Sequence, residues 1–158
     1  QTKQGDHSSH MRAIQEVPKH GSIEELVNQG ILKTGIMHSC VTNNVPYVLT
    51  GSIRDDGPLP ETITDNLLAQ DAMRAHTKKA TSVVMMASAL HSIATGNMLP
   101  LFYVKNELIN PLLTVCVDQT EFIVNKLRDR GTHQAYGVVT NAQDFVHRIK
   151  EELMHYEK

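Results

Sequence analysis

Residues that could take part in chemistry stand together in the segment TGSIRDDGPLP, residues 50–60, where Arg54 precedes Asp55 and Asp56. Adjacent carboxylates repel each other, so each must be solvated, paired or bound to a ligand. In a binding site the guanidinium could pair with a substrate carboxylate while an aspartate held the substrate ammonium. An internal Arg–Asp pair that stiffens the loop explains the same residues, and the residue types alone favour this simpler interpretation.

Gly51 and Ser52 open this loop, and Pro58 and Pro60 are typical of the first turn of a following helix. Backbone N–H groups at such a place could bind a pyrophosphate, helped by the positive end of the helix dipole. The usual dinucleotide fingerprint G-x-G-x-x-G is missing from the chain. A plain turn is therefore the simpler interpretation of these glycine and serine residues.

Asp118 ends the apolar run LLTVCVD, residues 112–118. Many dinucleotide-binding folds place an acidic residue there to accept hydrogen bonds from the adenosine ribose. The sequence Asp-Gln-Thr-Glu at 118–121 also matches a capping box, in which the carboxylate only caps the next helix. Both interpretations stay open.

His91 is a candidate proton carrier, because histidine titrates near neutral pH, although a lone histidine is more often structural. The histidines of the first forty residues show no H-E-x-x-H spacing of a zinc enzyme. We therefore predict no metal site.

The composition is that of an ordinary globular domain: 158 residues, 41% hydrophobic, with a formal net charge of −2. Basic residues are scattered, which argues against nucleic acid or an anionic membrane as a partner. Cys40 and Cys116 form no C-x-x-C pair, and no apolar run approaches the roughly 18 residues that span a bilayer. We expect a reducing, cytoplasmic setting.

Apolar runs alternate with helical patterns along the chain. Ser22 and Glu25 form a capping box for a short helix that Gly30 closes, and Gly96-Asn97 marks a turn or a helix end. Strands are predicted over 45–51, 81–88, 112–118 and 134–140, and helices over 22–30, 33–44, 61–80, 119–131 and 141–158. Residues 102–111 fit neither pattern.

Strands that are apolar on both faces and alternate with helices predict an α/β fold, a Rossmann-like parallel sheet with helices on both faces. Ligands of such sheets bind beyond the carboxyl ends of the strands. The loops that start at Gly51, Ser88, Asp118 and Thr140 would gather there and form one cleft.

The sequence also resembles a known family. Its specific matches are SIRDDGPLP within residues 45–65, LHSIATGNMLP at 90–100, and the segments 69–76, 114–119 and 126–141. Together they resemble the carboxy-terminal region of archaeal-type ornithine cyclodeaminases, the LOR/SDH region that also occurs in cyanobacterial bifunctional arginine dihydrolase/ornithine cyclodeaminases. The likeness runs from about His7 to Thr140.

The resemblance implies an NAD-binding Rossmann-like module similar in layout to deoxyhypusine synthase. It also implies conversion of L-ornithine to L-proline with release of ammonia, in which a hydride leaves the substrate α-carbon and later returns. A basic amino acid is then the substrate, and the remaining half of a longer parent enzyme is a partner. We also expect a homo-oligomer.

Roles follow from the resemblance together with loop position. The catalytic candidates are Asp55, Asp56 and His91, and the cofactor-binding candidates are Gly51, Ser52, Ile53, Arg54, Gly57, Asn97 and Asp118. His91 and Asn97 are expected to share one loop of the cleft.

We predict an amino-terminal extension over residues 1–21, which continues from a missing upstream part, and a Rossmann-like domain over 22–158. Two alternative functions remain open. One is a non-catalytic nucleotide-binding or assembly module of a larger amino-acid-metabolising enzyme, and the other is a transferase of the deoxyhypusine synthase type.

Overall fold

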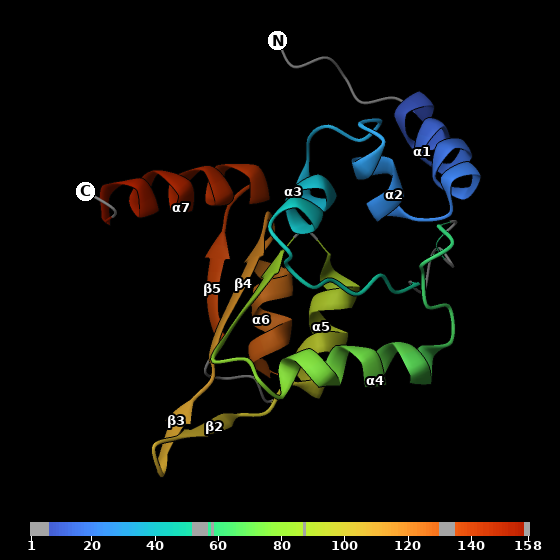
Figure 1. Cartoon of the computed structure of the whole chain (residues 1–158). Coiled ribbons are helices and arrows are strands. Elements are labelled where there is room, and N and C mark those ends of the chain that lie inside the picture. The colour runs from blue at the N-terminus through green and yellow to red at the C-terminus, as the bar shows by residue number, and fades with distance from the viewer. Residues whose placement is uncertain (1–6, 52–56, 58, 87, 130–134, 157–158) are drawn as a thin grey trace. The chain divides into compact units, whose positions relative to one another are not determined.

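The structure, a computed structural model, describes residues 7–51, 57, 59–86, 88–129 and 135–156 (Figure 1). The chain forms two compact units, Gln1–Ala72 and Met73–Lys158. The predicted boundary between residues 21 and 22 stays a prediction.

Three short helices build the first unit: α1 His7–His20, α2 Ile23–Asn28 and α3 Ile36–Thr42. Val17, Ile23 and Leu26 are buried together in its core. The Ser22 hydroxyl accepts a hydrogen bond of 3.1 Å from the Glu25 backbone N–H, as the capping box predicts. The predicted helices at 22–30 and 33–44 are therefore confirmed.

The predicted strand over residues 45–51 is wrong. This segment runs as a loop whose β-structure is one isolated parallel bridge, between Thr50 and Ile63. A strand needs a continuous partner ladder, whereas among the described residues the segment bonds through its backbone only to Ile63, at Leu49 and Gly51, and to Cys40, at Val45. Pro46 also removes one donor.

A carboxylate ties this loop to α2. Glu61 accepts a hydrogen bond of 2.7 Å from the Ile23 backbone N–H and one of 3.5 Å from the Tyr47 hydroxyl. Partial burial, and then the negative charge of Glu61, raise the pKa of the Tyr47 phenol. Glu61 thus bonds to Ile23, which lies 38 positions earlier in the chain. This role of Glu61 was not predicted from the sequence.

Helix α4, Asn66–Thr77, begins later than the predicted helix that the two prolines would open. The Asp65 carboxylate accepts hydrogen bonds of 2.9 Å from the backbone N–H groups of Leu67 and Leu68, so it caps the helix. We predicted that the loop at 51–57 leads directly into a helix. This prediction is wrong, because α4 begins only at Asn66.

The second unit contains a parallel three-stranded sheet of order β1-β4-β5: β1 Ser82–Met86, β4 Leu113–Asp118 and β5 Ala135–Val139. Met85 lies opposite Cys116, and Cys116 lies opposite Gly137. The last three predicted strands and their parallel pairing are confirmed. The described sheet has three strands instead of the predicted four, because residues 45–51 do not join it.

Helices α5 Ala89–Met98 and α6 Glu121–Asp129 lie side by side against one face of the sheet (Figure 1). Their residues Ile93, Val124 and Ile123 pack with Met85 and Cys116 in the core of the unit. Gly96 and Asn97 lie in the last turn of α5, which ends at Met98, so the predicted helix end is confirmed to within two residues. Helix α7, Ala142–Tyr156, closes the chain as predicted and contacts β4.

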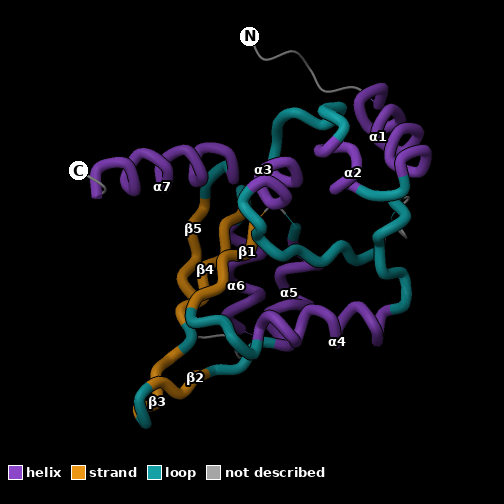
Figure 2. Tube along the Cα trace, viewed as in Figure 1, coloured by secondary structure: helices purple, strands orange, loops and turns teal. Residues whose placement is uncertain are grey.

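Residues 102–111, which fit no predicted element, form an antiparallel hairpin of β2 Phe102–Lys105 and β3 Leu108–Pro111. Its turn residues Asn106 and Glu107 both have positive φ, 54° and 63°. Such a turn suits a two-residue hairpin loop, but glutamate rarely adopts this conformation. Figure 2 shows the hairpin as a separate pair of strands that extends away from the parallel sheet.

Gly137 gives a test of how closely α6 approaches β5. A Cβ added there would collide with the side chain of Val124 on α6. We expect Gly137→Ala to lower the free energy of unfolding by about 1–3 kcal/mol, the usual cost of overpacking a core. Urea titration followed by circular dichroism measures this change.

The matched control is the same substitution in a Val124→Ala background, which removes the colliding methyl groups. Gly137→Ala should then cost clearly less than in the parent sequence. An equal cost in both backgrounds would contradict the proposed close contact.

The two cysteines should differ in reactivity and in their effect on stability. Cys116 is 1% exposed, and burial raises the pKa of its thiol, while Cys40 is partly exposed. The folded state holds the Cys116 proton more tightly, so the free energy of unfolding should fall as pH rises above roughly 8.5, the ordinary thiol pKa.

A thiol reagent should label Cys40 first, and Cys116 only as the protein unfolds. Between pH 7.5 and about 9.5, before tyrosines titrate, Cys116→Ala should remove part of the pH dependence of the unfolding free energy. Rapid labelling of Cys116 in the folded protein would contradict the burial of its side chain.

Candidate functional site

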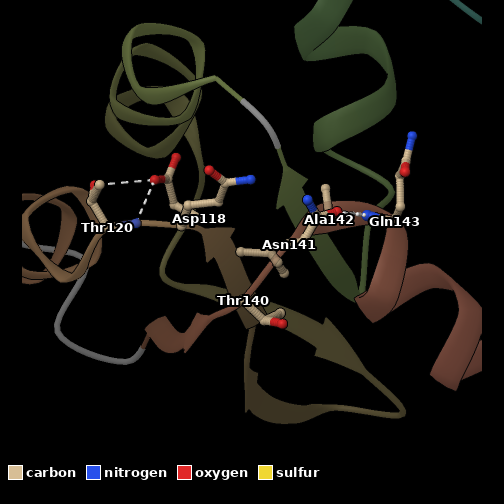
Figure 3. A pocket seen from close by; sticks show the side chains of 8 residues that line it. Asp118, Thr120, Thr140, Asn141, Ala142 and Gln143 are labelled. Atoms are coloured by element: carbon tan, nitrogen blue, oxygen red, sulfur yellow. Dashed lines mark hydrogen bonds between the residues drawn. The ribbon is translucent and has the colours of Figure 1, made fainter. Parts of the chain in front are cut away.

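A pocket of about 480 Å³ lies at the carboxyl ends of β4 and β5 (Figure 3). Loops after the two strands line it with Val117, Asp118, Gln119, Thr120, Thr140, Asn141, Ala142 and Gln143. This volume is within the range of small-molecule sites, and the position is where ligands of open parallel sheets bind. Two of the four loops predicted to gather at this edge are therefore brought together.

The Asp118 carboxylate fixes the loop before α6. Its Oδ1 accepts hydrogen bonds from the Thr120 backbone N–H at 2.9 Å and from the Thr120 hydroxyl at 3.1 Å (Figure 3). These bonds close a turn before α6, which begins at Glu121, so Asp118 orders the approach to the helix and is not its N-cap residue as the capping interpretation predicts. Among the described residues nothing donates to Oδ2, so one oxygen of this carboxylate still has its full capacity to accept.

Asn141 caps helix α7 on the other side of the pocket. Its Oδ1 accepts a hydrogen bond of 2.8 Å from the Gln143 backbone N–H at the start of α7. The Thr140 N–H donates to the Asp118 carbonyl at 2.9 Å, which holds the two loops together. Thr120, Asn141 and Gln143 were not predicted as site residues, although an Asx residue between a strand and a helix is a recognisable capping signal.

His91 and Asn97 do not share a loop, because the segment between them is helical. His91 is exposed in the first turn of α5, where its backbone N–H donates to the Ser88 hydroxyl at 3.5 Å. Asn97 lies six residues on, in the last turn, roughly 9 Å along the helix axis. Since β1 leads into α5 through residue 87, His91 lies toward the carboxyl edge of the sheet and Asn97 lies away from it.

Most of the charged loop falls outside the described residues: Ser52, Ile53, Arg54, Asp55 and Asp56. Its two ends, Gly51 and Gly57, belong to the first unit. Gly57 has a φ of 74°, and a Cβ there would collide with Thr62, so the position requires glycine. The roles predicted for these seven residues stay predictions.

The first unit holds a larger cavity of about 680 Å³ among α1, α2 and α3. Its walls are mostly aliphatic, with Ile23, Leu26 and Met37 inside and with Arg12 and Glu16 as the charged residues. Its lining has one carboxylate, Glu16, one side-chain hydroxyl, Thr34, and no side-chain amide, so the more polar pocket beside Asp118 is the better candidate for a polar ligand.

Within the part of the chain that the structure describes, no three His, Cys, Asp or Glu side chains are grouped so that they could hold a metal ion. The described helices also include none that is long and apolar enough to cross a membrane.

A sequence profile of the family described as "Arginine dihydrolase ArgZ-like, C-terminal, Rossmann fold" matches residues 1–149. The chain belongs to this family. The Rossmann class predicted from the alternating strands and helices is confirmed, while the closer likeness to deoxyhypusine synthase stays a prediction.

Relatives and solved structures agree with this assignment. An ornithine cyclodeaminase of Methanocaldococcus jannaschii is 51% identical over 154 residues, which cover 98% of this chain and 34% of the relative. The crystal structure of a conserved putative LOR/SDH protein from Methanococcus maripaludis superposes with a TM-score of 0.85 at 45% identity, covering 96% of this chain and 43% of the other.

A third similarity involves a protein solved with ligands. The ternary complex of AgrE with ornithine and NAD⁺ matches with a TM-score of 0.73 at 42% identity, covering 88% of this chain and 19% of the AgrE chain. The chain thus spans about a third of the length of the curated relative from M. jannaschii and a smaller share of AgrE.

Proposed function

We propose that this chain is the nucleotide-binding part of an NAD-dependent ornithine cyclodeaminase, which converts L-ornithine to L-proline and ammonia. The observation that carries the proposal is the pocket beside Asp118, at the edge where Rossmann folds bind dinucleotides. The family membership of the chain and its similarity to AgrE, which was solved with ornithine and NAD⁺, support NAD as the ligand of this pocket.

The residues of the pocket fit the adenosine end of NAD. Asp118 Oδ2 can accept from a ribose hydroxyl while Oδ1 keeps its bonds to Thr120, so the turn and ribose binding are compatible. The side-chain amides of Gln119 and Gln143 supply further donors and acceptors. The carboxylate would repel a 2′-phosphate, so this site should prefer NAD to NADP.

NAD⁺ would take a hydride from the α-carbon of ornithine and return it after the δ-amine has closed the ring and the α-amine has left as ammonia. The atoms balance without a net oxidant, because the hydride returns to the same carbon. The part of the protein is to hold the nicotinamide against the α-carbon and to move protons at the two nitrogens.

We assign the remaining predicted residues to the substrate end of the cofactor. Gly51, Ser52, Ile53, Arg54 and Gly57 would form the loop that faces cofactor and substrate, with Asp55 or Asp56 on the substrate ammonium. His91 would carry a proton. Changing Asp55 and Asp56 in turn to asparagine in the parent enzyme, with turnover and stability measured together, tests the loop assignment.

The second candidate is a nucleotide-binding or assembly module without turnover of its own. The observation in its favour is that the chain spans only 34% of the M. jannaschii relative. In that case the chain would hold a nucleotide, or an interface, for chemistry performed elsewhere in the parent. We further propose a cytoplasmic setting and a homo-oligomer. Light scattering of the parent enzyme can test the oligomeric state.

Isotope transfer in the full-length parent tests the proposed reaction. With L-ornithine deuterated at the α-carbon, we expect proline that keeps deuterium at its α-carbon, because the hydride leaves and returns. With ¹⁵N at the α-amine, the label should appear in ammonia. Mass spectrometry of both products measures the outcome, and proline that lost deuterium or kept the label from the α-nitrogen would contradict the mechanism.

Asp118→Asn separates ribose binding from the turn before α6. The Oδ1 atom of asparagine can accept the same two bonds from Thr120, so the melting temperature should change little. Losing a charge-assisted bond to ribose costs about 1.5–3 kcal/mol, so NAD binding in the parent should weaken roughly tenfold or more. Calorimetric titration of NAD measures this affinity, and wild-type affinity in the variant would leave Asp118 with its role in the turn alone.

A further inference from the structure

One face of the parallel sheet carries exposed apolar side chains. Val84, Met86, Leu113 and Tyr136 are 46%, 40%, 48% and 65% exposed. The strand register places them on one side: Val84 pairs with Val115, which in turn pairs with Tyr136. The opposite side holds Met85 and Cys116, which are 6% and 1% exposed beneath α5 and α6.

The topology explains why the connecting helices cover one face. The other face is open except at its carboxyl end, where Val117, the partner of Met86, is 1% exposed. The chain moves from β1 through α5 to β4, and then through α6 to β5, always in the same direction across the sheet. Right-handed crossovers that step in one direction put their helices on the same face. Doubly wound sheets cover the second face with helices from their other half, because parallel sheets are buried on both sides.

Helix α7 presents a second uncovered apolar surface in the same unit. Ile149 and Leu153 are spaced four residues apart, on one side of the helix, and are 39% and 59% exposed. Val146, three residues before Ile149, is 49% exposed. An amphipathic helix normally turns such a stripe toward a core. Exposed apolar patches of this kind mark surfaces that bind another protein region.

We propose that the open sheet face and the apolar stripe of α7 form the docking surface for the preceding region of the parent polypeptide. About two thirds of the M. jannaschii relative lies outside the matched part, and the family is defined as a carboxy-terminal domain. In this proposal a region that precedes the carboxy-terminal domain supplies the other half of a doubly wound arrangement. The inference depends on the proposed place of this chain in a longer enzyme, and does not depend on ornithine chemistry.

The occupant has a defined chemistry. It presents helices whose apolar residues meet Val84 and Tyr136, with polar groups at the rim where the Tyr136 hydroxyl needs a partner. A second copy of this chain is the alternative occupant. It is less suitable, because the preceding region is covalently joined to the chain and docks without losing translational freedom to a separate molecule.

Cysteine labelling tests the docking surface. Tyr136→Cys and Leu153→Cys are made separately in a Cys40→Ser background, both in the isolated chain and in the full-length parent. The control is Glu151→Cys, which lies on the opposite side of α7 from the Ile149 stripe and is exposed. Maleimide labelling rates are measured at low and high protein concentration.

We expect both probe positions to react at least about tenfold more slowly in the parent than in the isolated chain, because labelling then requires local opening. The Glu151→Cys control should react equally in both. Equal rates at Tyr136→Cys and Leu153→Cys in chain and parent would overturn the proposal. A second outcome would also overturn the proposal: slow labelling of the isolated chain at high but not at low protein concentration. That result would identify a second copy of the chain as the occupant.

Turnover measured on the same parent preparations separates this proposal from the proposed function. Protected positions without proline formation would support docking and reject the cyclodeaminase assignment. Proline formation with freely labelled positions would do the reverse.

Discussion

The parallel pairing of β4 with β5 is the constraint on which the candidate site depends. Each residue of β4 from Thr114 to Asp118 has its partner in β5, and the Thr140 N–H extends the ladder to the Asp118 carbonyl. Because both strands run the same way, their loops must leave at the same edge. Asp118 and Asn141 then meet across the pocket although they are far apart in the sequence.

The elements that the sequence predicts correctly are those with a local cause. Residues 113–118 and 135–139 are continuous apolar strands, and Ser22 and Glu25 set the start of α2 through a bond between near neighbours. The prediction failed where contacts with other parts of the chain determine the local structure. Residues 45–51 have strand-like composition but lack a ladder in the described structure, and the cap at Asp65 overrides the prolines as the start of α4. The hairpin at 102–111 turns on Glu107 with positive φ, which no propensity predicts.

The site was predictable to a similar extent. Asp118 could be found because a carboxylate after an apolar strand has two recognisable roles, and in the structure it orders the turn before α6. The contribution of Asn141 requires the register of two strands, which the sequence does not contain. The ornithine chemistry lies further still from local pattern, because neither the pocket nor its hydrogen bonds distinguishes one amino-acid substrate from another. Only the resemblance to a family supplied that expectation.

A Rossmann unit that covers one face of its sheet is suited to a composite enzyme. Its candidate pocket lies at the sheet edge and is held by bonds within the unit, such as those from Thr120 to Asp118 and from Gln143 to Asn141. Its apolar face at Val84 and Tyr136 needs a cover from outside the unit. Because α6 packs on β5 through the space left at Gly137, a distortion of the sheet by a docked region would be transmitted to the pocket loops that begin where these elements end. Close packing on the covered face therefore couples the geometry of the pocket to what covers the other face.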